Sequence, residues 1–138
     1  MKKILIIDDD EVFAKTLADT LLKEKYIVSH VSNGEEGLNE MVKNVPDIII
    51  LDLLMPKLGG VDFLTILKKN GGNKIPILIS SQLSKMEDIS NAIVAGIDVG
   101  VKGYIIKASE NLDKIVEEIE KTLAKTQTNN VSSRKYLG

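Results

Sequence analysis

Short apolar runs alternate along the chain with segments in which apolar residues recur at helical spacing. The runs span residues 4–7, 47–52, 75–79 and 101–106, and a more alternating run spans residues 26–31. Continuous runs of Ile, Leu and Val are typical of parallel strands buried on both faces, whereas alternation is typical of a strand with one exposed face. The pattern therefore predicts five strands, with residues 26–31 at an edge of the sheet.

The intervening segments predict helices. Apolar residues at helical spacing follow Asp10, Asn33 and Gly60, and recur over residues 86–95 and 111–124. This alternation of strand and helix predicts right-handed βαβ units around one parallel sheet. The expected fold class is α/β, a doubly wound, flavodoxin-like (βα)5 domain over residues 1–125 with strand order 2-1-3-4-5. Residues 126–138 are expected to form a polar, frayed tail.

Composition narrows the classes of function. The 138 residues include no cysteine, and the formal net charge is −2. Disulfides and thiolate metal sites are thereby excluded, and nothing predicts a general attraction to nucleic acid. The stretch Met1-Lys2-Lys3 precedes only four apolar residues, unlike a signal peptide or a membrane span. We therefore expect a soluble cytoplasmic protein that binds neither nucleic acid nor membrane directly.

Polar residues stand at the carboxyl ends of four predicted strands. They are Asp8-Asp9, Asp52, Ser80-Ser81 and Lys107. In the order 2-1-3-4-5 the first and third strands are neighbours, so the three aspartates should converge. Crowded carboxylates repel each other, and a cation that prefers oxygen ligands, such as Mg²⁺, removes the conflict. A metal, an ammonium and a hydroxyl around one carboxylate suit a phosphoryl group, which carboxylates are able to accept.

Four motifs in this order resemble those of response-regulator receiver domains of two-component signalling. They are Ile4–Asp10, Asp52–Gly60, Pro76–Ser81 and Gly103–Lys107. The resemblance covers residues 2 to about 124. It implies that Asp52 accepts a phosphoryl group from a histidine kinase or a phosphotransfer protein. It also implies a Mg²⁺ cofactor held by Asp8, Asp9, Asp52 and the backbone carbonyl of Leu54.

The resemblance also implies which residues act as the switch. Lys107 and a serine of the fourth strand would bind the phosphoryl group, and Tyr104 would change rotamer in response. In the family the hydroxyl residue usually stands five positions after the proline of this strand, which selects Ser81. Ser80 is the alternative, although strand alternation would point it to the opposite face.

The output face implied by the resemblance consists of the fourth helix, the fifth strand and the last helix. Phosphorylation would repack this face, which would bind a downstream protein partner and could join two copies of the chain. About four residues more than usual lie between Gly96 and Gly103, roughly one helical turn, and they alter this face.

Three positions near the proposed phosphoacceptor depart from the usual pattern of the family. Gln82 is larger than the residue that usually follows the switch hydroxyl. Leu54 and Leu83 occupy positions that in the family often modulate dephosphorylation, and neither side chain can orient an attacking water. We therefore expect slow loss of phosphate from Asp52.

Several other functions are less consistent with the sequence. We expect a signalling switch that assists its own phosphorylation and is not a conventional enzyme. A haloacid-dehalogenase phosphohydrolase would need a second aspartate where Leu54 stands. A nucleotide- or flavin-binding module would need a glycine-rich loop where Asp8–Asp10 stands. The alternatives to a stand-alone response regulator are a phosphorylation-independent pseudo-receiver and the receiver portion of a longer regulator. His30, the sole histidine, is interpreted as a half-exposed structural residue of the edge strand.

Overall fold

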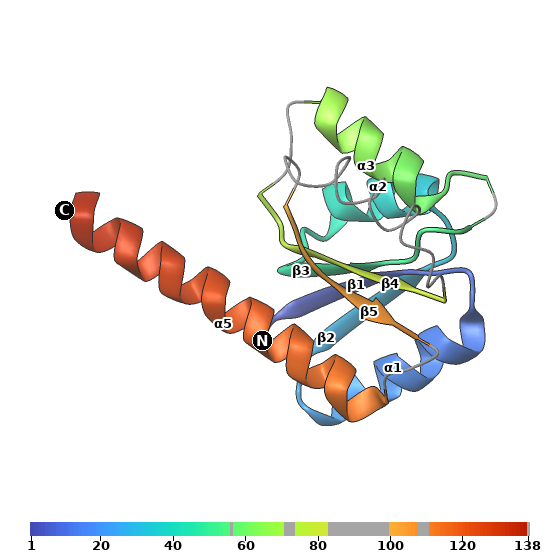
Figure 1. Ribbon diagram of the computed structural model, residues 1–138, viewed down its shortest axis with the longest axis horizontal. Coiled ribbons are helices and arrows are strands. Elements are labelled where there is room, and N and C mark those ends of the chain that lie inside the picture. Colours follow the sequence, from blue (N-terminus) through green and yellow to red (C-terminus); the bar gives the residue numbers. More distant parts are fainter. Residues whose placement is uncertain (56, 71–73, 83–99, 108–110, 138) are drawn as a thin grey trace.

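The chain builds one parallel sheet with helices on both faces (Figure 1). The computed structural model describes residues 1–55, 57–70, 74–82, 100–107 and 111–137, with the backbone alone at residue 81 and from residue 127 on. The strands are β1 (Lys3–Ile7), β2 (Ile27–Val31), β3 (Ile48–Leu51), β4 (Ile77–Ser81) and β5 (Val101–Ile106). The helices of the described ranges are α1 (Glu11–Lys23), α2 (Gly34–Lys43), α3 (Gly60–Lys69) and α5 (Leu112–Leu137). The helix predicted over residues 86–95 lies outside the described residues.

The sheet has the order β2-β1-β3-β4-β5, and every neighbouring pair of strands is parallel. The predicted fold class and strand order are therefore confirmed. Alternating side chains divide the core into two layers. One layer lies between the sheet and helices α1 and α5, and includes Ile6, Ile50 and Ile119. The other lies between the sheet and helices α2 and α3, and includes Ile7 and Phe63. Because both faces are covered, β1 and β3 are continuous apolar runs.

Local signals set the starts of the helices around the carboxyl end of the sheet. Asp10 caps α1 by accepting a hydrogen bond from the Phe13 backbone N–H at 3.0 Å. Asn33 caps α2 in the same way, with the Glu36 N–H at 2.9 Å. At the start of α3, a Cβ on Gly60 would lie 2.3 Å from the Asp52 carbonyl oxygen. The loop after β3 can therefore close in this way only around glycine.

Two elements differ from their predicted bounds. β4 begins at Ile77 and not at Ile75, because Pro76 has no N–H to donate, and the strand runs on to Ser81. Helix α5 does not end at Ala124 but continues to Leu137, so the tail predicted to be frayed is helical. Residues 125–137 contain no glycine or proline to end a helix. Figure 1 shows the second half of α5 projecting away from the sheet.

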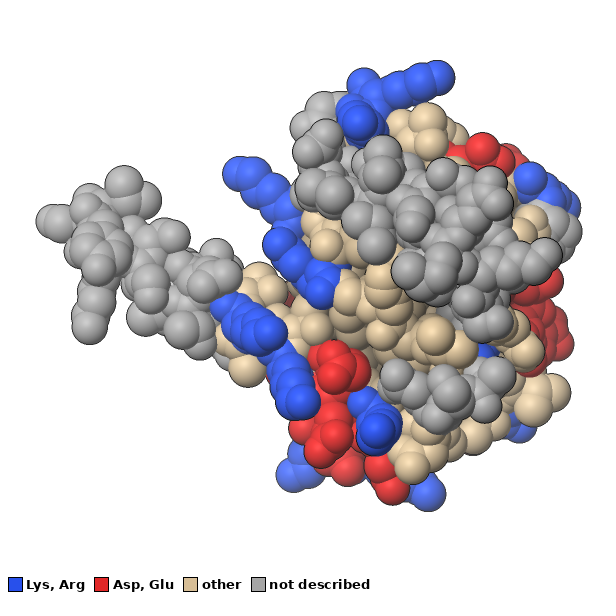
Figure 2. All heavy atoms as spheres, viewed as in Figure 1, with Lys and Arg blue, Asp and Glu red and all other residues tan. Residues whose placement is uncertain are grey.

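The described surface carries charges of both signs. In Figure 2, lysine side chains gather beside the first half of α5 and alternate there with acidic ones. None of the described helices is long and apolar enough to cross a membrane.

Candidate functional site

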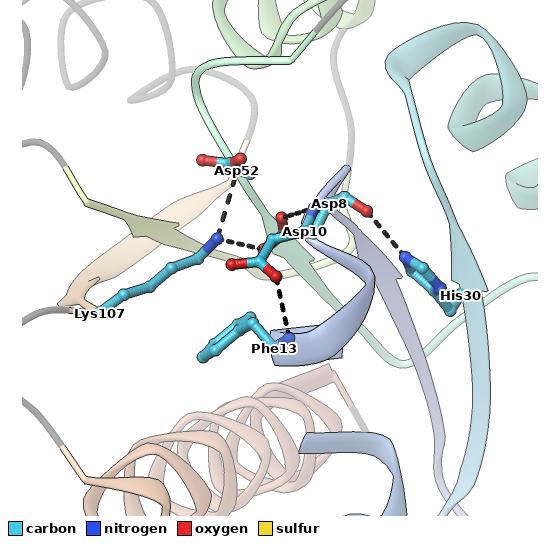
Figure 3. Close-up of polar contacts among 6 residues, drawn as sticks. All are labelled: Asp8, Asp10, Phe13, His30, Asp52 and Lys107. Carbon is cyan, nitrogen blue, oxygen red and sulfur yellow. Dashed lines mark hydrogen bonds and ion pairs between the residues drawn. The ribbon is translucent and has the colours of Figure 1, made fainter. Parts of the chain in front are cut away.

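Three carboxylates converge at the carboxyl end of the sheet, as the sequence predicted. Ile7 pairs with Leu51 across β1 and β3, which brings the following residues, Asp8 and Asp52, side by side (Figure 3). One carboxylate oxygen from each of Asp8, Asp9 and Asp52 lies within 4.8 Å of the others. Asp8 is 1% exposed and Asp52 is 6% exposed, whereas Asp9 is exposed to solvent.

Lys107 supplies the positive charge of the cluster from the end of β5. Its Nζ lies 2.6 Å from Asp8 Oδ2 and 3.8 Å from Asp52 Oδ2. The ammonium also lies 4.5 Å from the centre of the Phe13 ring, a cation–π contact from α1. In this state Lys107 is therefore held by Asp8 and Phe13 more closely than by Asp52. Phe13 is one of the apolar residues that follow Asp10 at helical spacing, and the sequence did not predict this second role.

Asp8 is held at both its backbone and its side chain. Its N–H donates to the Val31 carbonyl at 3.0 Å, and its Oδ1 accepts from the Asp10 N–H at 2.9 Å. Its own carbonyl contacts His30 Nε2 at 2.7 Å. His30 is exposed, and it reaches the site from β2 (Figure 3). Sequence reasoning assigned this histidine no link to the site. The only signal is its place on the strand next to β1.

The electrostatics of Asp52 are those of a buried carboxyl among like charges. Burial and the neighbouring Asp8 raise the pKa of Asp52 from 3.8 to about 7. Lys107 and a hydrogen bond from the Leu54 backbone oppose this rise in pKa, and Asp9 adds to it. A divalent cation would relieve this repulsion, and the donors present are all oxygens, which Mg²⁺ prefers. The residues therefore fit a Mg²⁺ site, while ligation by the Leu54 carbonyl stays a prediction.

The pairing of β4 with β3 fixes the side of the sheet that Ser80 faces. Leu51 pairs with Ile79, so Ser80 lies beside Asp52 and continues the face that carries α1 and α5. Ser80 is fully buried, and its Oγ has no hydrogen-bond partner among the described residues. Ser80 therefore stays the alternative to Ser81 as the switch residue. The backbone of Ser81 pairs with Ile106, and its side chain is not described. The assignment of the switch to Ser81 stays a prediction that rests on family spacing.

The remaining predicted residues lie around this end of the sheet. Tyr104 is half-buried, pairs with Ile79 and packs on the layer next to α3, and burial raises its pKa. Leu54 and Gln82 are exposed. Leu83 and residues 97–99 of the stretch between Gly96 and Gly103 lie outside the described residues.

Comparison with known proteins agrees with this geometry. The family described as the response regulator receiver domain matches residues 4–120. The chain belongs to this family. The receiver domain is 34% identical over 106 residues to a probable transcriptional regulator, ycf27, of Guillardia theta, which covers 77% of the chain and 39% of that protein. It is 33% identical over 105 residues to the response regulator MprA of Mycobacterium sp. (strain KMS), which covers 76% of the chain and 44% of that protein.

Solved structures show the same fold. The receiver domain of the Francisella response regulator 1452 superposes with a TM-score of 0.77 at 26% identity, covering 91% of this chain and 99% of that one. A CheY-like receiver domain protein from Methanospirillum hungatei JF-1 gives a TM-score of 0.79 at 23% identity, covering 94% and 98%. The chain spans about half the length, or less, of the curated relatives it matches. The chain is thus a receiver domain of a two-component system, a family that generally binds Mg²⁺ at an acidic pocket and interacts with histidine kinases.

Proposed function

We propose that this receiver domain accepts a phosphoryl group on Asp52 from a histidine kinase or a phosphotransfer protein, with Mg²⁺ bound by Asp8, Asp9 and Asp52. One observation carries the proposal: three carboxylates lie within 4.8 Å of one another, and two of them, Asp8 and Asp52, share Lys107, whose side chain is 5% exposed. Three carboxylates this close repel one another in the folded chain, and a bound cation relieves the repulsion. A cation and a phosphoryl group together would match its charges.

The transfer step follows from the positions of these groups. An oxygen of the ionised Asp52 carboxylate attacks the phosphorus of a phosphohistidine. The new P–O bond forms as the P–N bond breaks, and the electron pair stays on the imidazole nitrogen, which takes up a proton. Bound Mg²⁺ would supply the positive charge that favours ionised Asp52 and offsets the charge of the phosphoryl oxygens. Lys107, now 3.8 Å from Asp52, would need only a short movement away from Asp8 to meet those oxygens.

The proposed role is that of a switch and not of a conventional enzyme, since the chain carries the phosphoryl group itself. Movement of Lys107 would be transmitted along β5 toward the output face. Within the described residues this face holds a hollow of about 350 Å³ lined by Lys102, Glu118, Lys121, Thr122, Lys125 and Thr126. Three lysines against one glutamate favour an acidic segment of a downstream protein partner. Dimerisation through the same face is a second expectation for this surface.

The phosphorylated state should persist. Leu54 is 63% exposed beside Asp52 and has no polar atom in its side chain to orient an attacking water. A lifetime of minutes or longer is expected after the phosphodonor is removed, and a lifetime of seconds would contradict this part of the proposal.

Intact-mass spectrometry after incubation with phosphoramidate and MgCl₂ tests phosphorylation. The wild type should gain the mass of one phosphoryl group, and chelation of the metal should prevent the gain. Asp52→Asn should gain none, whereas Asp19→Asn, at an exposed position on α1, should behave like the wild type. No gain in the wild type, or an unchanged gain in Asp52→Asn, would favour a phosphorylation-independent pseudo-receiver.

Beryllofluoride with MgCl₂ tests the response of the fold. The chemical shifts of Tyr104 should change in the wild type and stay unchanged in Asp52→Asn.

A further inference from the structure

His30 completes the hydrogen bonding of β1 at the point where the strand ladder stops. Successive bonds connect β1 and β2, from the Ile27 N–H to the Lys2 carbonyl up to the Asp8 N–H to the Val31 carbonyl. A regular parallel ladder would continue with a bond from the N–H of residue 33 to the Asp8 carbonyl. Asn33 instead begins the cap of α2. The His30 ring occupies the place of the missing donor, at 2.7 Å from the Asp8 carbonyl oxygen.

The direction of this hydrogen bond is set by chemistry. A carbonyl oxygen only accepts, so Nε2 of His30 must carry the proton. Both the neutral ring protonated at Nε2 and the imidazolium meet this condition. The contact is therefore available whichever charge the histidine carries.

The Asp8 carbonyl belongs to the peptide plane that leads into Asp9. Because the peptide unit is planar, a donor that fixes this oxygen also fixes the direction in which the Asp9 Cα leaves β1. Asp9 is exposed, yet its carboxylate lies within 4.8 Å of those of Asp8 and Asp52. The side chain of Asp8, by contrast, is already held by Lys107 and by the Asp10 N–H. The effect of His30 should therefore fall mainly on Asp9.

We infer that His30 is a positioning residue for the cation site, because its ring fixes the Asp8–Asp9 peptide and thereby holds the Asp9 carboxylate toward Asp8 and Asp52. The inference rests on the proposed function for the identity of the cation. The ordering of the Asp8–Asp9 peptide rests on the hydrogen bond alone. It gives the sole histidine a role that does not require it to touch either metal or phosphate.

Three substitutions at His30 distinguish loss of the hydrogen bond from an effect on the strand itself. His30→Gln places an amide nitrogen at about the reach of Nε2 and should retain the bond. His30→Asn is too short to reach the carbonyl, and His30→Thr removes the donor while keeping a residue that favours strands. Loss of one such hydrogen bond corresponds to a change of about fivefold in an equilibrium constant. We therefore expect Mg²⁺ affinity, measured by amide chemical shifts during MgCl₂ titration, to fall about fivefold in the Asn and Thr variants and to be kept in Gln.

A second measurement uses the metal-free protein. Hydrogen exchange of the Asp10 amide, which donates to Asp8 Oδ1, should speed up about fivefold in the Asn and Thr variants and not in Gln. The urea midpoint of the Gln variant should agree with that of the wild type, and those of the Asn and Thr variants should fall only slightly, because the ring is exposed and a single hydrogen bond is lost. Equal Mg²⁺ affinity in the wild type and Asn, or a Gln variant as weak as Asn, would overturn the inference. If the amide chemical shifts of the wild type do not change with Mg²⁺, the proposed metal site is refuted, but the role of His30 in the metal-free protein is not. Equal exchange of the Asp10 amide in all four proteins would then overturn the role of His30.

Discussion

Replacing Asp52 with asparagine should stabilise the metal-free protein, and the gain should grow with pH. The folded chain raises the pKa of Asp52 to about 7 by burial and by the nearby Asp8, against an ordinary value of 3.8. The folded state therefore keeps a proton that the unfolded state has already lost between these pH values. The stability that this proton contributes is fully present below about pH 4 and is lost as the pH rises to about 7. Asparagine never bears the charge, so the variant loses nothing over this range.

The size of the effect follows from the same two pKa values. A difference of about three pH units at about 1.4 kcal/mol per unit gives about 4 kcal/mol as the upper limit. Urea unfolding in EDTA at about pH 5, 6, 7 and 8 would measure the difference in unfolding free energy between Asp52→Asn and the wild type. The difference should be smallest at the lowest pH and approach about 4 kcal/mol at the highest. Added MgCl₂ should reduce it, since a ligand that binds the wild-type site stabilises the wild type by mass action.

Asp19→Asn provides the control, because Asp19 is an exposed acid on α1. Its unfolding free energy should follow that of the wild type at each pH. A difference between Asp52→Asn and the wild type that stays constant across the series would refute the reasoning, since a constant difference cannot come from a proton gained only on folding.

Three further substitutions probe the scaffold around the site by urea unfolding. Gly60→Ala should cost about 2 kcal/mol, because its Cβ would lie 2.3 Å from the Asp52 carbonyl oxygen, whereas Gly59→Ala, with 3.3 Å to its nearest atom, should cost clearly less. Similar losses at the two glycines would show that the contact is not limiting. Lys25→Gly should raise the unfolding free energy by about 1 kcal/mol, because Lys25 follows the C-cap residue of α1 and has a φ of 68°, a conformation that favours glycine. A loss of stability there would contradict this account of the turn. Lys107→Met should cost about 3 kcal/mol near pH 8, because it leaves two buried carboxylates without their ammonium, while exposed Lys102→Met should change little. Equal effects at the two lysines would count against the buried ion pair.

The fold was predictable because the buried strands are visible in the sequence as continuous apolar runs. β3 and residues 4–7 of β1 are covered on both sides, and each reads as an uninterrupted run of Ile and Leu. The bounds predicted for the fifth strand, Val101–Ile106, are those observed. The end of α5 was missed because an apolar stripe records packing and not helix formation. The apolar stripe ends at Leu123, yet the helix continues to Leu137 although its last residues do not pack on the sheet.

The site was predictable where it depended on strand order and not where it depended on side-chain reach. Asp8 and Asp52 follow neighbouring strands, so their convergence required only the topology. The contact between His30 and the Asp8 carbonyl joins a side chain to a backbone atom 22 residues away, and no residue pattern records such a bond. The side of the sheet on which Ser80 lies depended on the register of β4 against β3, which spacing alone does not show.

The long last helix would let the domain act as a lever. Helix α5 packs on the sheet through Ile115, Ile119 and Leu123 and then continues as helix to Leu137. At about 1.5 Å per residue its 26 residues extend roughly 40 Å. A tilt of about 5° at the packed base would displace the far end by about 3 Å. A small repacking at the base of α5 would thus become, at Leu137, a movement large enough to make or break a contact.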